Sequence, residues 1–257
     1  MAGRIYVTGD CHGSFHKFSM KNFPEQRDLD KEDYVIICGD FGGIWAVGRE
    51  SRHEQHWLDW LEAKSYTTLF VDGNHENFDR VVGYPQKEWH GGIVHEIRPS
   101  VLHLSRGQIF DICGMRVFAF GGASSHDISD GILDPEEEDF LSKKKRFDRE
   151  YKQYRIRHLT WWDEEIASLE QMRVGKESLR RNDYAVDYII THCGPTSILP
   201  NIAQIEDGEY LSDRQTDYLE YIRNYANYSK WYFGHYHIDS EISEKEVATY
   251  NKIVRLI

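Results

Sequence analysis

Histidine and carboxylate side chains recur in this sequence directly after short apolar runs. Asp10 and His12 follow one such run, and Asp40 follows the next. Three later runs end in the same way, followed by Asn74 and His75, by His192, and by His235 and His237. A single histidine at a strand end is usually an ordinary polar terminus. Five of the 13 histidines stand at these points, however, which favours one shared site.

The side chains at these five points form a donor set of imidazoles, carboxylates and one amide oxygen, a set that suits manganese, iron or zinc. Seven candidate ligands are too many for one ion and fit two ions that share a carboxylate: Asp10, His12, Asp40, Asn74, His192, His235 and His237. Two ions roughly 3.5–4 Å apart form the arrangement used for in-line attack on phosphorus. The sequence therefore predicts two divalent or trivalent ions that activate a hydroxide against a phosphoester, manganese being the first candidate and iron or zinc the alternatives.

The elements that must position these residues alternate between strands and helices. Runs rich in Val, Ile, Tyr and Phe and closed by glycine predict five buried strands: "RIYVTGDCHG", "DYVIICGDFGG", "TTLFVDGNHE", "DYAVDYIITHCGP" and "KWYFGHYH". Helical spacing of apolar residues occurs at 53–65 and 212–226, with Ser212 as the expected N-cap of the second helix. This alternation predicts an α/β architecture, in which sites form beyond the carboxyl ends of the strands.

The other segments predict a meander, an insertion and a closing edge. Residues 91–122 contain short β-like runs broken by Gly and Pro, and residues 136–173 have the pattern of a long helix. Residues 241–257 predict one or two closing strands. Because the sequence shows no repeat and no flexible linker, we expect a single domain over 1–257 with a helical insertion at about 136–173.

These motifs together resemble the calcineurin-like metallophosphoesterase superfamily, in particular its small bacterial and phage-type members. The match is carried by Asp-Cys-His at 10–12, Gly-Asp at 39–40, Gly-Asn-His-Glu at 73–76, His192, and Gly-His-Tyr-His at 234–237. The segment "GGASSHD" at 121–127 is a softer match. The resemblance implies a four-layer sandwich, two β-sheets flanked by helices, with a dinuclear metal centre between the strand ends.

The resemblance also implies a role for each residue. One ion would be held by Asp10, His12 and His237, the other by Asn74, His192 and His235, with Asp40 bridging the two. The expected catalytic residues are His75 and Glu76. His75 would contact the phosphate and, when protonated, assist the leaving oxygen as a general acid, with Glu76 as its acidic orienter.

Two features separate the chain from the Ser/Thr protein phosphatases that share these motifs. Gly43 stands where many relatives have a second Asp, and the Arg-Gly that continues this motif in protein phosphatases is absent. The missing arginine would otherwise bind the phosphate. An arginine from residues 146–157 would replace it, although a solvated helix face is the plainer interpretation of the basic segment 143–157. Ser124 and Asp127 either line the cleft or form a simple turn.

Charge and composition restrict the partners. The net charge of −12 over 257 residues argues against nucleic acid, which binds to basic surfaces. No run approaches the roughly 18 apolar residues of a membrane span. The start "MAGRIYVTGD" leaves no room for a signal peptide, and the four scattered cysteines fit a reducing compartment.

We therefore expect a cytoplasmic enzyme that hydrolyses mono- or diesters of phosphate, with a small phosphorylated or nucleotide molecule as substrate. Two alternatives remain open: a protein-binding scaffold on the same fold, and a Ser/Thr phosphoprotein phosphatase.

Overall fold

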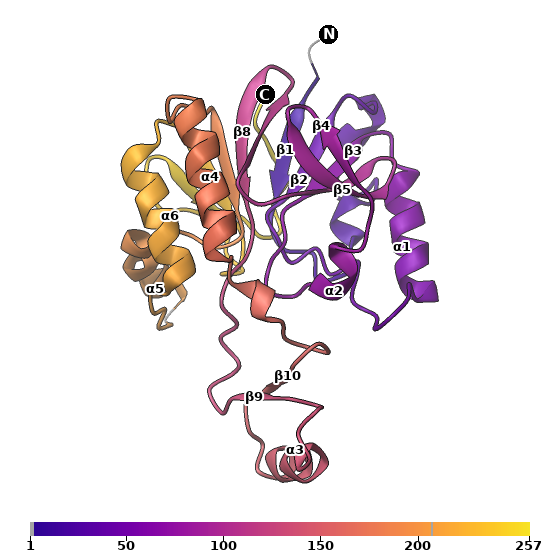
Figure 1. The fold of residues 1–257 in the computed structure, drawn as a ribbon. Coiled ribbons are helices and arrows are strands. Elements are labelled where there is room, and N and C mark those ends of the chain that lie inside the picture. Colours follow the sequence, from indigo (N-terminus) through magenta and orange to yellow (C-terminus); the bar gives the residue numbers. More distant parts are fainter. Residues whose placement is uncertain (1–2, 207) are drawn as a thin grey trace.

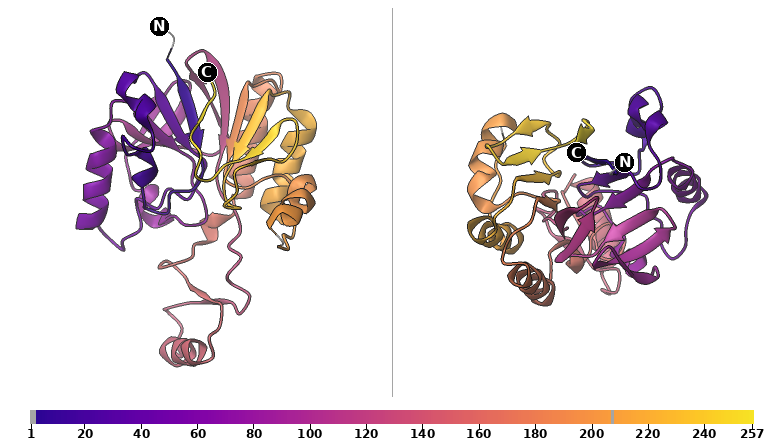
Figure 2. Two further views of the ribbon diagram at one scale, coloured as in Figure 1. Left: turned by 180° about the vertical axis from the view of Figure 1, so that it is seen from behind. Right: turned by 90° about the horizontal axis from the view of Figure 1, so that it is seen from above.

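Two β-sheets packed face to face form the centre of the computed structural model, which describes residues 3–206 and 208–257 (Figures 1 and 2). The seven-stranded sheet has the order β15 (Val254–Arg255), β1 (Ile5–Thr8), β2 (Tyr34–Ile37), β3 (Thr67–Phe70), β6 (Val101–Leu104), β5 (Gly92–Arg98) and β4 (Gln86–Trp89). The six-stranded sheet has the order β13 (Ser240–Glu241), β14 (Glu246–Ala248), β12 (Lys230–Phe233), β11 (Tyr188–Thr191), β8 (Met115–Phe120) and β7 (Gln108–Ile112).

Helices flank the pair of sheets on both sides. On the side of the seven-stranded sheet lies α1 (Arg52–Glu62), and the short α2 (Phe78–Val81) follows β3. On the side of the six-stranded sheet lie α4 (Leu169–Arg181), α5 (Leu199–Glu206) and α6 (Arg214–Tyr225). The described residues also form four 3₁₀ turns: His16–Phe18, Pro24–Asp28, Asp163–Glu165 and Thr196–Ile198. This confirms the predicted α/β sandwich of two sheets flanked by helices.

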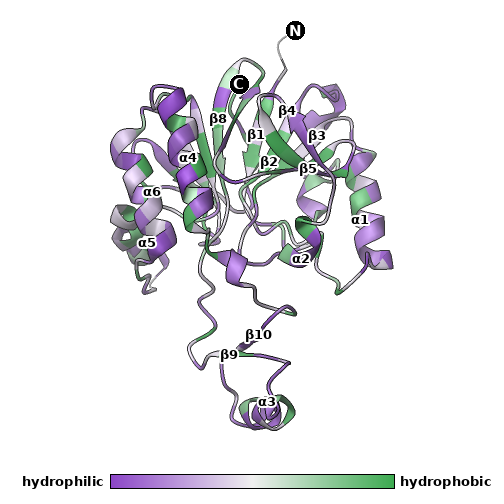
Figure 3. Cartoon of the chain, viewed as in Figure 1, coloured by the Kyte–Doolittle hydropathy of each residue, from purple (hydrophilic) through white to green (hydrophobic). Residues whose placement is uncertain are grey.

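Three apolar clusters hold the layers together. Between the sheets, Ile36 of β2 packs in one cluster with Phe110 of β7 and Ile190 of β11. A second cluster joins Leu58 of α1 to its sheet, and a third joins Leu219 of α6 to the other sheet. The central strands are thus buried on both faces, which explains why their sequences are continuous apolar runs rather than alternating ones (Figure 3).

Parallel pairing brings the polar strand ends together. In the first sheet β2 pairs in parallel with both β1 and β3, and in the second sheet β11 pairs in parallel with both β8 and β12. The carboxyl ends of β1, β2 and β3 therefore lie at one edge of the first sheet, and those of β8, β11 and β12 at one edge of the second. His192 after β11 contacts Asn74 after β3, so the two edges adjoin, and the loops there can gather functional side chains.

Most sequence-derived elements are present, with small differences at their ends. Residues 91–122 form antiparallel pairs, β5 with β6 and β7 with β8, but the two pairs lie in different sheets. The expected N-cap Ser212 is wrong by one residue, because Asp213 accepts the hydrogen bond from the backbone N of Thr216 that begins α6. None of the described helices has the length and apolar character needed to cross a membrane.

An arm projects from the sandwich between β8 and α4 (Figure 1). It contains β9 (Ile132–Leu133), α3 (Phe140–Arg149) and β10 (Arg155–Ile156), and β9 pairs in parallel with β10. Within α3 no residue is buried, and the helix stands at the tip of the arm (Figure 3).

The prediction of a long helix over 136–173 was wrong. Tyr151 and His158 have left-handed backbone angles, φ 53° and 54°, which a continuous α-helix cannot contain. Between them Arg155 pairs with Ile132 as a strand residue. A new helix begins only after Ser168, whose side chain caps α4 in a capping box with Gln171. The helical periodicity of this segment therefore belongs to two helices separated by extended chain.

Candidate metal centre

All seven candidate ligands lie in loops at the shared edge of the two sheets. These loops follow β1, β2, β3, β11 and β12. Four of the ligands have positive φ angles, which non-glycine residues rarely adopt: His12 (46°), Asp40 (46°), His235 (70°) and His237 (53°). Such backbone strain persists only where the surroundings hold it, and it concentrates at functional sites.

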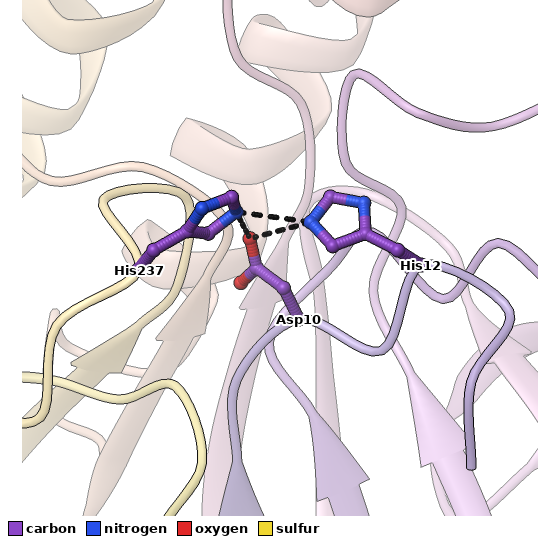
Figure 4. A group of neighbouring side chains, drawn as sticks. All are labelled: Asp10, His12 and His237. Carbon is purple, nitrogen blue, oxygen red and sulfur yellow. Dashed lines mark hydrogen bonds and ion pairs between the residues drawn. The ribbon is translucent and has the colours of Figure 1, made fainter.

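Asp10, His12 and His237 form the first group (Figure 4). The Nε2 atoms of His12 and His237 are 2.9 Å apart, and Oδ2 of Asp10 lies 3.6 Å from the former and 3.2 Å from the latter. These separations suit neighbouring ligands on one ion with bonds of about 2.0–2.2 Å.

His192 is the centre of the second group. Its Nδ1 donates a hydrogen bond to the carbonyl oxygen of Cys38 at 2.8 Å, which leaves the lone pair of Nε2 free in the neutral ring. That Nε2 faces Oδ1 of Asn74 at 3.1 Å and Oδ1 of Asp40 at 3.3 Å. With the ring in this form, Nε2 of His192 and the two oxygen atoms are all electron-pair donors with no hydrogen between them. A bound cation would satisfy all three.

Asp40 connects the two groups. Its Oδ1 faces His192 of the second group, and its Oδ2 lies 3.6 Å from Nδ1 of His12 in the first. A single carboxylate therefore lies within reach of both sets of ligands, as a bridging ligand must.

His235 reaches the centre in a different way. Its backbone N donates to Asp10, 2.9 Å from Oδ1, and its ring lies beside that of His192 with the centroids 4.9 Å apart. The ring Nε2 is 2.7 Å from Nε2 of His126. Sequence reasoning did not select His126, although "GGASSHD" follows the apolar run of β8 and so repeats the strand-end pattern.

The charge balance of the site fits bound cations. The carboxylates of Asp10 and Asp40 are almost completely buried, with 2% and 1% of each residue exposed. In the part of the chain that the structure describes, the only basic side chains within 4.0 Å of either carboxylate are histidines: His12 and His237 for Asp10, and His12, His75 and His192 for Asp40. Buried anions without an arginine or lysine partner are costly unless a metal ion compensates their charge. The site therefore has the ligands and the charge to hold metal ions.

Glycine allows two of these close approaches. A Cβ at Gly73 would collide with Oδ1 of Asp40, and a Cβ at Gly234 would collide with Oδ1 of Asp10. Both positions therefore require glycine, since any side chain would displace a carboxylate from the site.

His75 lies beside the ligand groups with its ring partly exposed. Its backbone N donates to Oδ1 of Asp40 at 2.8 Å, while its Nε2 is 4.0 Å from Oδ2 of the same residue. Burial lowers the pKa of His75 to about 4, and the nearby Arg155 contributes to that shift against the attraction of Asp40. Without bound metal the imidazole is therefore neutral at neutral pH, in contrast to the protonated His75 expected from the sequence.

Glu76, which the resemblance makes the orienter of His75, forms its hydrogen bonds with the loop after β2. The carboxylate of Glu76 is fully buried and accepts hydrogen bonds from the backbone N of Phe41 at 2.7 Å and of Gly42 at 3.4 Å. Burial and the nearby charge of Asp40 raise its pKa well above the ordinary value. Glu76 thus holds the loop that carries Asp40, and it acts on the site through that loop.

Arg155 is the residue that contacts the ring of His75. Its Nη1 is 3.4 Å from Nδ1 and its Nη2 is 3.3 Å from Nε2 of the imidazole. Asp127 holds the guanidinium with two hydrogen bonds, 2.7 Å from Nε and 2.9 Å from Nη2. The basic segment 143–157 therefore contributes one buried arginine to the centre, whereas α3 remains a solvated helix. Asp127 has a defined partner and is more than a turn residue.

Most of the chain also matches a known protein family. The sequence profile of the calcineurin-like phosphoesterases matches residues 3–239 of the 257. The chain belongs to this family. None of the curated proteins compared with the chain matches it. Membership in the calcineurin-like phosphoesterases supports a metal-dependent phosphoester hydrolase, in agreement with the groups of possible metal ligands.

The cysteines of this calcineurin-like phosphoesterase do not add a nucleophile. Cys11 and Cys193 adjoin the site but are buried and free. Burial raises the pKa of the Cys11 thiol to about 12 and that of Cys193 well above its ordinary value. Both thiols are therefore protonated at neutral pH and serve as packing residues.

Three cavities adjoin the metal centre of this phosphoesterase. The first, of about 620 Å³, is lined by Asp10 and His12 together with Lys17 and Lys252. The second, of about 570 Å³, is lined by His235 and other residues near His126. The third, of about 380 Å³, is lined by His12, Trp45 and His75. Each of the three cavities is therefore lined by at least one candidate ligand.

Proposed function

We propose that this chain hydrolyses mono- or diesters of phosphate on small molecules with the help of two bound metal ions. The single observation that carries the proposal is the position of Asp40, which lies between Asp10, His12 and His237 on one side and Asn74 and His192 on the other. When bound, the two ions supply positive charge for the phosphate oxygens and make a water molecule acidic enough to attack phosphorus.

The residues divide into metal ligands and substrate contacts. We assign Asp10, His12 and His237 to one ion and Asn74, His192 and His235 to the other, with Asp40 shared. His126 is a further candidate ligand for the second ion, because its Nε2 lies 2.7 Å from that of His235. Manganese is the first choice for both ions, with iron or zinc as alternatives.

Arg155 and His75 are the proposed substrate contacts. A guanidinium presents a planar set of N–H donors that matches two phosphate oxygens. Arg155 is a permanent positive charge next to His75, and its orientation is fixed by Asp127. His75 then needs only to donate a hydrogen bond to the leaving oxygen, which its neutral ring can do through one N–H.

A small substrate fits the charge and the location proposed for the protein. The net charge of −12 is unfavourable for a nucleic acid, and the cavities at the centre are of ligand size. All four cysteines are free, which supports a reducing compartment such as the cytoplasm. The arginine clamp supplied by the arm differs from the protein-phosphatase motif, so we do not extend the proposal to phosphoproteins.

Hydrolysis of p-nitrophenyl phosphate and bis-p-nitrophenyl phosphate with added Mn²⁺ tests the proposal. We expect turnover that requires metal and that falls at least about 100-fold in Asp40→Asn. Asp134→Asn, a change in the arm away from the ligands, is the matched control and should retain activity. Bound metal without turnover of either ester would favour a non-catalytic, protein-binding role instead.

A further inference from the structure

The cavity of about 570 Å³ beside His235 has the features of a specific binding site. It lies between the first residues of the arm and the segment that joins α5 to α6. Its lining includes His126, Ile128, Leu199, Tyr210, Leu211 and Tyr236. We propose that this cavity binds the organic group of the phosphoester, and that this group is an uncharged ring. The inference rests on the proposed function and specifies its substrate class.

Aromatic side chains form the inner wall of the cavity. The ring of Tyr210 contacts that of His126 edge-on, with centroids 5.4 Å apart, and that of Tyr236 edge-on, with centroids 4.9 Å apart. Tyr210 is only partly buried, so part of its surface remains available to a ligand. Rings of this kind favour a flat, ring-bearing partner, which buries apolar area and stacks against them.

The charge of the lining selects against anions. None of the residues that line this cavity in the described part of the chain is a lysine or an arginine, whereas Glu209 and Asp213 both line it. The cavity of about 620 Å³ is instead lined by two lysines, Lys17 and Lys252, together with the acidic Asp10 and Glu25. An additional phosphate or carboxylate on the substrate would therefore be repelled from the cavity of about 570 Å³.

The position of the cavity connects it to the reacting centre. His235 lines the cavity, and its ring lies next to that of His192 in the candidate metal centre, with centroids 4.9 Å apart. His126 lines it as well, at 2.7 Å from His235. An organic group in the cavity therefore has its ester end at the second group of ligands.

Two phosphate monoesters separate binding from intrinsic reactivity. Benzyl phosphate and ethyl phosphate have primary alcohols of similar acidity as leaving groups, and only the first carries a ring. We expect kcat/KM to be at least about tenfold higher for benzyl phosphate, because the ring is buried in the cavity. Turnover of both esters at equal kcat/KM would overturn the inference and leave the proposed function intact.

Substitutions at Tyr210 identify the cavity as the origin of the preference. Tyr210→Ala should lower kcat/KM for benzyl phosphate about tenfold and for ethyl phosphate much less, while Tyr210→Phe should retain the preference. Tyr151→Ala, at a tyrosine that is 93% exposed in the arm, is the control and should leave the ratio unchanged. An unchanged ratio in Tyr210→Ala would place the ring elsewhere and contradict the inference.

A charged ring tests the role of the acidic lining. We expect kcat/KM for 4-carboxybenzyl phosphate to be at least about tenfold lower than for benzyl phosphate, and Glu209→Gln to recover part of that loss. Equal rates for the two esters in the unaltered enzyme would contradict an acidic, anion-excluding cavity.

Binding distinguishes failure of this inference from failure of the proposed function. If neither these two esters nor the two p-nitrophenyl esters are hydrolysed, the proposed function fails, and the cavity is then tested by calorimetry with benzylphosphonate and ethylphosphonate on metal-loaded protein. Benzylphosphonate should bind about tenfold more tightly, and Tyr210→Ala should remove that difference. Equal affinities would overturn the inference independently of any activity.

Discussion

The guanidinium of Arg155 lies against the imidazole of His75, with Nη2 3.3 Å from Nε2. The two residues are 80 positions apart in the chain, and Arg155 belongs to β10 of the arm. Asp127 fixes the guanidinium from the other side, and only 9% of the arginine side chain is exposed. The arm thus completes the site at which we propose that phosphate binds.

Replacing Arg155 should therefore impair catalysis more than metal binding. We expect Arg155→Ala to lower kcat/KM for p-nitrophenyl phosphate about 100-fold, and Arg155→Lys to recover little, because an ammonium cannot form the two-pronged contact. Metal content, measured by elemental analysis, should stay unchanged. Arg149→Ala, at an exposed arginine of α3, serves as control. Wild-type kinetics in Arg155→Ala would remove this residue from the proposed mechanism.

Replacing His75 should affect the rate of the chemical step. His75→Asn removes the imidazole next to Arg155 without removing a proposed metal ligand, so we expect kcat to fall about 10²–10⁴-fold with metal stoichiometry retained. His56→Asn, at an exposed histidine of α1, is the control. A loss of metal in His75→Asn would instead make this residue a ligand, as its proximity to Asp40 and His12 would permit.

The buried ion pair between Arg106 and Asp72 should contribute strongly to the free energy of unfolding. Arg106 donates to the carboxylate of Asp72 at 2.8 Å, and the exposed fractions of the two residues are 6% and 2%. Arg106→Leu leaves this carboxylate with His103 alone, so we expect the free energy of unfolding to fall by about 3–5 kcal/mol. Denaturant titration of Arg106→Leu and of Arg106→Leu with Asp72→Asn checks this, because the second change should restore part of the loss. No difference between the two variants would contradict the explanation.

The same pair implies loss of stability in acid. Burial alone would raise the pKa of Asp72, but Arg106 and His103 hold it well below its ordinary value. A carboxyl with a lowered folded-state pKa contributes stability above the unfolded pKa of about 3.9, and this contribution is lost as the pH falls through the folded-state value. Unfolding titrations from pH 5 to pH 2 should therefore show a smaller slope for Asp72→Asn than for the unaltered protein.

The buried carboxyl group of Glu165 should make the protein less stable as the pH rises. Burial raises the pKa of Glu165 to about 8, so the folded protein holds this proton more tightly than the unfolded chain. Its stabilising effect is full below the ordinary pKa and is lost as the pH rises toward 8, at no more than about 1.4 kcal/mol per pH unit. Metal-free Glu165→Gln should show a flatter pH dependence between pH 5 and pH 8 than the metal-free parent. An identical slope would contradict a buried, protonated Glu165.

The grouping of the candidate ligands could be anticipated from sequence, because residues that follow parallel neighbouring strands lie at the same edge of a sheet. Asp10, Asp40, Asn74, His192 and His235 each follow a buried strand, and parallel pairing gathers the ends of those strands at one edge. The apolar runs that form these strands can be identified from local sequence alone. The same rule applied to β8 would have led to His126.

The arm and its contacts could not be anticipated in this way. The backbone is left-handed at Tyr151 and His158, which divides the segment 136–173. The spacing of apolar residues in this segment gives no sign of that division. The pairing of Arg155 with Asp127 joins residues 28 positions apart that no local pattern relates. The place of Glu76 in the motif suggests a role beside His75, and no local pattern shows that its carboxylate accepts a hydrogen bond from the backbone of Phe41.

Metal stoichiometry tests the central proposal most directly. Protein purified in the presence of manganese and freed of loosely bound ions should contain two ions per chain by elemental analysis, and Asp40→Asn should contain one or fewer, because Asp40 lies between the two ligand groups. Asp134→Asn should contain two. Only trace metal in the unaltered protein after supplementation with manganese, iron or zinc would contradict the proposed dinuclear centre.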